Sequence, residues 1–120
     1  MNKQADKLKS GLVFLCDQHG KVTELIYDGL KIASDELQGK PWSTLVDEAS
    51  QKKSANFMES IDSEGATVDW ELNLQTDLGI ETFSFAGINQ GEKYMIIIAK
   101  TNREATQLVE EFTRIGNEQM

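Results

Sequence analysis

Residues 67–74 alternate between polar and apolar side chains, and this pattern constrains the fold more than any other feature of the chain. The apolar side chains in this segment are Val68, Trp70, Leu72 and Leu74. A period of two is typical of a β-strand that turns one face toward a core and the other toward solvent. The segment therefore predicts a strand of a sheet that is covered on one face.

Four further segments are predicted to be strands of the same sheet. Residues 12–16 and 21–27 are rich in apolar side chains, and the polar link between them ends in Gly20, which predicts a hairpin. Residues 80–88 and 93–100 each follow a turn sequence. The last segment is apolar at consecutive positions, which predicts a central strand that is buried on both faces.

Helices are predicted between the two groups of strands and after the last strand. Ser34 and Asp47 are suited to cap helices, and Pro41 suits a first helical position, so short helices and one longer helix are expected before Gly65. Because the strands cluster and do not alternate with helices, the predicted class is α+β. It consists of a five-stranded antiparallel sheet with short helices on one face and a C-terminal helix.

The C-terminal helix is predicted to begin at Asn102 and to carry an apolar seam with steps of three and four residues. A helix of this length is marginal in water on its own, so the seam needs a partner. That partner is either the domain's own sheet or a second copy of the chain. The seam residues are Ala105, Leu108, Phe112 and Ile115.

Length and composition exclude several classes of protein. A chain of 120 residues suits a single domain, and its net charge of −8 argues against nucleic acid or an anionic membrane as the main partner. The single cysteine cannot form an internal disulfide, which favours a reducing compartment. No apolar run approaches the ~20 residues that a membrane-spanning helix needs. We expect a cytoplasmic domain with no membrane insertion in this segment.

Five sequence segments resemble the PAS domain, a sensory module of bacterial signalling proteins. They are GLVFLCD at residues 11–17, LQGKP at 37–41, DWELN at 69–73, FSFAG at 83–87 and EEFTRIGNE at 110–118. The resemblance covers nearly the whole chain. Within the family, the chain most resembles a subgroup that often precedes histidine kinase or cyclase effectors. It is specific for the fold, because PAS motifs mark architecture more than ligand chemistry.

The resemblance implies a domain division and a function. Residues 1–10 would be an N-terminal flanking segment, 11–100 the PAS domain and 101–120 a connector helix to an effector. The implied function is a regulatory sensor that dimerises and passes a ligand- or partner-dependent signal through this helix to a histidine kinase or nucleotide cyclase. The alternative is a ligand-free interaction and dimerisation module with a filled core. A sensor should have a cavity of at least ~300 Å³ near the helical block, whereas a filled core should not.

A homodimer is the expected state of such a sensor. The seam spacing continues toward the C-terminus with no helix-stopping proline. Effectors of the resembling proteins also commonly work as dimers, and a symmetric pair is the commonest form of self-association. We therefore expect the partners to be a second copy of the chain, a downstream effector domain and a small-molecule ligand.

The sequence argues against a cofactor, a metal site and catalysis. Flavin photosensors that resemble this chain carry a cysteine in the helical block, whereas Cys16 lies on the first predicted strand. Haem-binding relatives usually offer a histidine on the long helix, whereas His19 lies in a hairpin turn. His19 also has no second metal ligand and no nucleophile at a suitable spacing, so we expect no metal and no enzymatic activity.

Two orientations are open for the strand at residues 67–74. The default places its apolar face inward and leaves Glu71 and Asn73 in water. The resemblance favours the reverse, because the position that matches Glu71 tends to face the ligand cavity in PAS domains. On that interpretation Glu71 and Asn73 bind a polar ligand, while Trp42 and Phe57 form an apolar wall or simply pack in the core.

Overall fold

The computed structural model describes residues 11–31 and 37–118, and for residues 114–118 it describes the backbone alone. All five predicted strands are present, with ends within two residues of the expected ones. The helical turn predicted to start at Ser34 lies outside the described residues. The elements in chain order are β1 (Gly11–Cys16), β2 (Val22–Asp28), the 3-10 helices η2 (Trp42–Leu45) and η3 (Glu48–Ser50), α2 (Gln51–Glu64), β3 (Ala66–Thr76), β4 (Gly79–Asn89), β5 (Tyr94–Ala99) and α3 (Asn102–Glu118).

The strands form one antiparallel sheet in the order β2-β1-β5-β4-β3. The last strand of the chain, β5, lies at the centre of the sheet, and all six of its residues are buried. This confirms the position that its consecutive apolar side chains predict. The pairs β1–β2, β3–β4 and β4–β5 are hairpins, and the helices lie in one block between β2 and β3 and, for α3, after β5, so the class is α+β, as expected.

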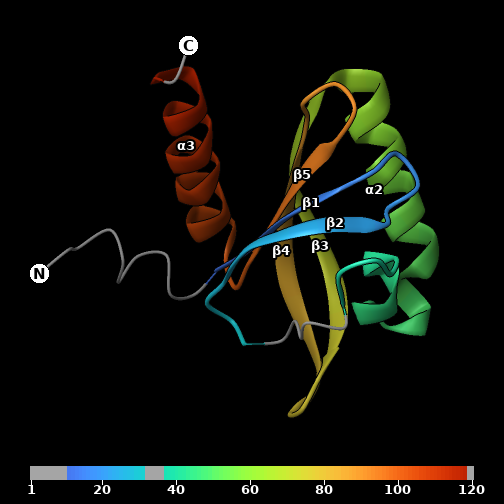
Figure 1. Cartoon of the computed structure of the whole chain (residues 1–120). Coiled ribbons are helices and arrows are strands. Elements are labelled where there is room, and N and C mark those ends of the chain that lie inside the picture. Colours follow the sequence, from blue (N-terminus) through green and yellow to red (C-terminus); the bar gives the residue numbers. More distant parts are fainter. Residues whose placement is uncertain (1–10, 32–36, 119–120) are drawn as a thin grey trace, which may run out of the picture.

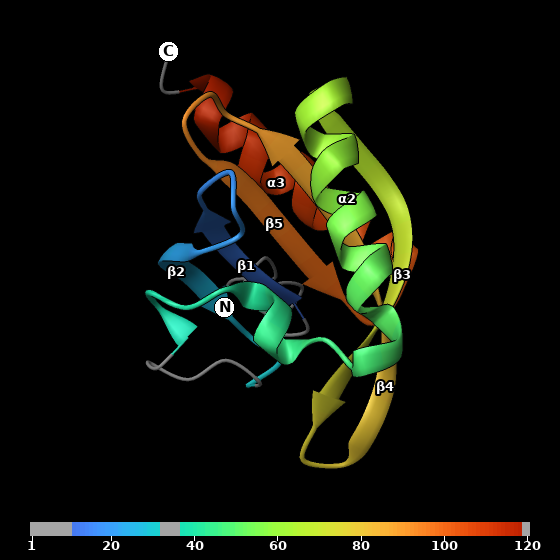
Figure 2. The same cartoon turned by 90° about the vertical axis from the view of Figure 1, so that its right-hand side faces the viewer.

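The sheet separates two helical layers (Figure 1). The short helices and α2 cover one face, which the view of Figure 2 shows from the front. The long C-terminal helix α3 covers the other face and contacts β4, β5 and β1. The three-layer arrangement explains why β5 has apolar side chains on both sides.

Each face of the sheet buries its own apolar cluster. The inner core lies between the sheet and α2, and the outer core lies between the sheet and α3. The inner core includes Leu12, Phe14, Trp42, Phe57, Ile61, Leu72, Leu74, Phe83, Phe85, Tyr94, Ile96 and Ile98. The outer core consists of Val13, Ala86, Met95, Ile97, Ala99, Ala105 and Leu108.

Glycines on the sheet allow both helices to approach closely. A Cβ atom on Gly87 of β4 would overlap the side chain of Ile61 in α2. A Cβ atom on Gly11 of β1 would overlap the side chain of Leu108 in α3. Any other residue at these two positions would require the overlapping side chain, or the helix that carries it, to shift.

The alternation of β3 is interrupted by a β-bulge near its start. The register with β4 shifts between Thr67 and Trp70, and Asp69 adopts a φ of 65°. A positive φ is uncommon outside glycine, and aspartate is among the residues that tolerate it. The bulge removes Val68 from the inner face and leaves its side chain 53% exposed. The predicted period of two therefore holds only from Trp70 onward.

Candidate functional site

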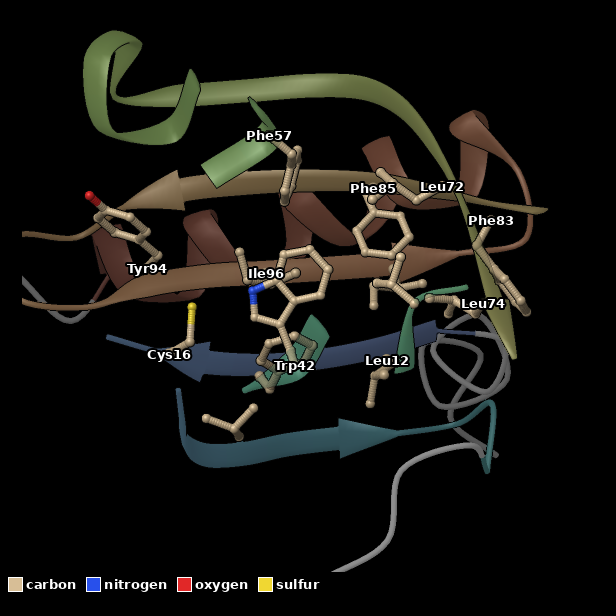
Figure 3. Packing of buried hydrophobic residues seen from close by; sticks show 14 of the residues in the cluster. Leu12, Cys16, Trp42, Phe57, Leu72, Leu74, Phe83, Phe85, Tyr94 and Ile96 are labelled. Carbon is tan, nitrogen blue, oxygen red and sulfur yellow. The ribbon is translucent and has the colours of Figure 1, made fainter. Parts of the chain in front are cut away.

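Trp42 lies in the inner core, where PAS-like folds were expected to hold a ligand. The backbone N–H of Trp42 donates to the carbonyl of Gly20 at 2.9 Å, which ties η2 to the β1–β2 turn. The Trp42 side chain is 1% exposed. Figure 3 shows it among Phe57, Phe85 and Ile96.

Aromatic rings surround the Trp42 indole on several sides. Its ring centroid lies 6.4 Å from that of Phe14, 6.0 Å from Phe57 and 5.6 Å from Phe85. Phe57 also makes an edge contact with Trp70 at 5.5 Å. The structure thus brings together Trp42 and Phe57, the two predicted wall residues. In this part of the interior, packed rings occupy the space that a ligand would need.

Two surface cavities flank Met58 on the outer side of Trp42. The first has a volume of about 200 Å³ and lies between α2 and the β1–β2 turn, beside Trp42 and Ser54. The second has a volume of about 250 Å³ and is lined by Asp62 and Tyr94. Met58 and His19 line both. Each is smaller than the ~300 Å³ expected of a sensor pocket near the helical block.

A third cavity lies at the opposite end of the inner core. The hairpin that joins β3 and β4 extends beyond the rest of the sheet (Figures 1 and 2). Between this hairpin and the end of β2 lies a half-open cavity of about 340 Å³. Its walls include Leu30, Leu78 and Phe83, and Lys31 and Lys100 are also part of its lining.

The polar side chains of this third cavity are organised by the hairpin turn. Thr76 Oγ1 donates to Glu81 Oε2 at 2.6 Å and accepts from the backbone N–H of Leu78 at 3.2 Å. The turn sequence that precedes the strand predicted at residues 80–88 therefore forms a turn, at residues 76–79. Leu78 lies at the tip of this turn and is 89% exposed.

Two buried titratable side chains lie at the Trp42 end of the inner core. Tyr94 Oη donates to Asp62 Oδ1 at 2.6 Å, and this hydrogen bond, together with burial, raises the pKa of Tyr94 to about 12. Burial, with a smaller contribution from the charge of Asp17, raises the pKa of the Cys16 thiol to about 12. Because the thiolate is the reactive form, Cys16 is a core residue of low reactivity.

The inward orientation predicted for Glu71 and Asn73 is wrong. Glu71 is exposed, and Asn73 is partly buried with its side-chain Oδ1 accepting from Thr82 Oγ1 on the neighbouring strand at 2.6 Å. Leu72 and Leu74, which alternate with them, are buried in the inner core. The simple pattern of alternation predicted the orientation correctly, because burying Leu72 and Leu74 outweighs the position that the resemblance suggested.

The C-terminal seam packs on the domain's own sheet. Ala105 and Leu108 are 1% and 3% exposed in the outer core, and Phe112 is partly buried at its edge. The side chain of Ile115 lies outside the described residues. The sequence left two partners open for the seam. The domain's own sheet contacts Ala105 and Leu108, and the homodimer stays a prediction.

Some of these residues had no signal in the sequence. Met58 meets Trp42 at one end of the inner core, and Leu30 meets Phe83 at the other, and in each case the two residues come from separate segments of the chain. The exposed apolar Leu78 in a turn was the one local feature that could have drawn attention to the third cavity. Among the described residues, no group of three or more His, Cys, Asp or Glu side chains is placed to hold a metal ion.

Comparisons with solved structures identify proteins that share this fold. The PAS domain of the RpfR quorum-sensing receptor from Cronobacter turicensis, in complex with BDSF, has a TM-score of 0.65 at 16% identity. The match covers 76% of this chain and 93% of that one. The same domain in complex with C12:0 has a TM-score of 0.64 at 15% identity, with the same coverage.

A second protein with this fold is a photoactive yellow protein domain from the sensor histidine kinase Ppr of Rhodospirillum centenum. It has a TM-score of 0.56 at 12% identity, and the match covers 76% of this chain and 92% of that one. The sequence itself matches no family model and no curated protein. None of the helices described is long and apolar enough to cross a membrane.

Proposed function

We propose that this chain, which has the PAS fold, is a sensory module of a signalling protein and not an enzyme. A change in the inner core is transmitted through the sheet to α3, and from α3 to an effector such as a histidine kinase or nucleotide cyclase. The Ppr neighbour is a domain of a sensor histidine kinase, which is consistent with this kind of output.

The observation that carries this proposal is that the same strands hold both cores. In β1, Phe14 belongs to the inner core and its neighbour Val13 to the outer core. In β5, Ile96 belongs to the inner core and Ile97 to the outer core. In β4, Phe85 and Ala86 are divided in the same way. Since packed interiors have few voids, a shift of these strands cannot move one layer and leave the other in place.

The third cavity supports a small amphiphilic ligand as the input signal. Its apolar residues Leu30 and Phe83 pack with the inner core, so a molecule bound there would contact the same apolar cluster that encloses Trp42 at the far end. The charged lining consists of Lys31, Lys100, Asp77 and Glu81, and of these the two lysines are suited to hold an anionic end group. The RpfR neighbour binds C12:0, which has this chemistry and is the natural first probe.

A titration with C12:0 tests this input. Binding measured by native mass spectrometry should weaken at least about tenfold, equivalent to about 1.4 kcal/mol, when Lys31→Asn and Lys100→Gln are combined. Asparagine suits position 31 because Lys31 has a positive φ of 61°. The control is Lys52→Gln with Lys53→Gln, which removes the same charge from exposed positions of α2. Equal weakening by both pairs, or no binding at all, contradicts this ligand class.

A homodimer is part of the proposed function. Phe112 and Ile115 continue the seam beyond Leu108, and apolar side chains of the sheet lie partly buried beside the helix. A second copy that covers Phe112 would place two α3 helices next to each other, as a connector to a dimeric effector requires. Small rotations of such a pair are a known form of switching.

A ligand-free interaction module is the second candidate, because aromatic side chains already fill the interior around Trp42. Native mass spectrometry of protein purified from cells separates the two. A retained molecule of defined mass supports the sensor. Protein that retains nothing, and that also fails to bind C12:0, supports the interaction module.

A further inference from the structure

We propose that Met58 is a site of reversible oxidation, through which hydroperoxides change the position of the buried Trp42 indole. This role is separate from ligand binding and does not depend on the proposed sensor function. It rests on the contacts of one thioether that links the surface to the inner core.

The Met58 sulfur is the hydrogen-bond partner of the Trp42 indole. Trp42 Nε1–H donates to Met58 Sδ at 3.4 Å, so the one polar atom of a 1% exposed ring depends on a weak acceptor. The indole in turn contacts the rings of Phe57 and Phe85. Any displacement of the indole therefore disturbs the inner core.

Met58 is also accessible from outside the protein. Its side chain is partly buried and lines both the 200 Å³ and the 250 Å³ cavities. Gly20 lies next to it, and a Cβ atom there would be 3.9 Å from the Met58 methyl group. A small peroxide can thus reach the Met58 side chain from either cavity, while the indole, which borders the first cavity, is almost fully buried.

The reaction is an oxygen-atom transfer that balances with a hydroperoxide as the oxidant. A sulfur lone pair attacks the terminal oxygen of the peroxide, the O–O bond breaks and an S–O bond forms. The sulfur loses two electrons, and the peroxide is reduced to an alcohol or to water with no net release of protons. The sulfoxide is polar and chiral, and methionine sulfoxide reductases restore the thioether.

Oxidation replaces a sulfur acceptor with an oxygen acceptor at a different position. The indole N–H then has to follow the oxygen or lose its partner, because a buried donor without an acceptor is costly. Both responses move the indole relative to Phe57 and Phe85. The oxidised side chain is also more polar than the thioether that packed against the inner core.

Met95 is an internal control for the reactivity of Met58. It lies on β5 in the outer core and is 7% exposed. Trypsin separates the two residues, since cleavage after Lys53, Lys93 and Lys100 places them in peptides 54–93 and 94–100. Mass spectrometry of the folded chain after graded hydrogen peroxide treatment should show Met58 oxidised at least about tenfold faster than Met95. Equal rates would contradict the proposal.

Fluorescence tests whether the oxidation reaches Trp42. In a Trp70→Phe background the remaining emission comes from Trp42, and it should shift as the Met58 sulfoxide forms and return after treatment with the reductases. Met58→Leu keeps the volume and removes the oxidisable sulfur, so the same peroxide treatment should leave its emission unchanged. If emission does not respond to complete oxidation of Met58, or shifts equally in the Met58→Leu variant, the proposal is wrong.

Discussion

One residue, Trp42, determines what the inner core can accommodate. Its indole is buried among three phenylalanine rings, at the place where the resemblance to PAS domains predicted a ligand wall. A ligand can enter this part of the core only if the indole moves. The 200 Å³ cavity lined by Trp42 and Met58 is a space into which the indole can move.

The orientation of β3 is tested by two adjacent residues. Glu71 is exposed and Leu72 is 1% exposed in the inner core. Glu71→Ala should therefore change the free energy of unfolding by no more than about 0.5 kcal/mol. Leu72→Ala removes buried methyl groups and leaves a cavity, so it should cost about 2–5 kcal/mol. Urea denaturation of both variants measures these free energies of unfolding. A large cost for Glu71→Ala would contradict the exposed position of Glu71 and support the inward orientation.

The Tyr94–Asp62 hydrogen bond predicts a dependence of stability on pH. The pKa of Tyr94 is raised from its ordinary value of 10 to about 12, so the folded state holds the phenolic proton more tightly than the unfolded state does. The resulting stabilisation is fully present below pH 10 and is lost as the pH rises toward 12. Relative to Tyr94→Phe, the unmodified chain should therefore become less stable over this interval.

Denaturation of both proteins at several pH values gives the difference directly. Below pH 10 the unmodified chain should be more stable than Tyr94→Phe by about 1 kcal/mol, the typical contribution of one hydrogen bond. A difference that does not depend on pH would show that Tyr94 titrates as it does in the unfolded chain.

At the scale of elements, local patterns predicted more than the family resemblance did. The period of two in β3 and the consecutive apolar residues of β5 predicted the face and the central position of these strands. The bulge at Val68 and Asp69 could not be predicted, because it depends on how β3 pairs with β4 and not on the residues of β3 alone. The resemblance identified the fold correctly and the direction of Glu71 incorrectly.

The variant Gly87→Ala tests how closely α2 packs on β4. Because the added Cβ would overlap Ile61, which is fully buried, the variant should be less stable by about 1–3 kcal/mol. Ile61→Ala alone also destabilises, because it leaves a cavity. The double variant should lose less than the sum of the two, since the smaller side chain makes room for the Cβ. Strict additivity in urea denaturation would show that the overlap is relieved elsewhere.

At the scale of the whole molecule, the order of elements was predictable and their long-range contacts were not. Two strands, short helices, three strands and a helix follow from periodicity and capping residues. The hydrogen bond between Tyr94 and Asp62 joins residues that are 32 positions apart, and nothing in either segment predicts it. The docking of α3 on its own sheet was one of two options, because an apolar seam does not specify its partner.

Self-association is tested by a charge placed in the seam. In sedimentation experiments at about 100 μM the unmodified chain should be a dimer, and Phe112→Glu should be a monomer, because a carboxylate is costly to bury in a contact between copies. Gln107→Glu adds the same charge at an exposed position of α3 and should remain dimeric. If the unmodified chain is a monomer at this concentration, or if both variants dissociate, the proposed contact is wrong.

Amide hydrogen exchange of α3 tests most directly whether the inner core controls this helix. Trp42→Phe alters the inner core without touching α3, and the amides of β5, at the centre of the sheet, report global opening. We predict that exchange in residues 102–113 becomes faster in this variant by a larger factor than exchange in β5. If α3 and β5 change by the same factor, or if α3 does not change, the two faces of the sheet are independent and the proposed route of the signal is contradicted.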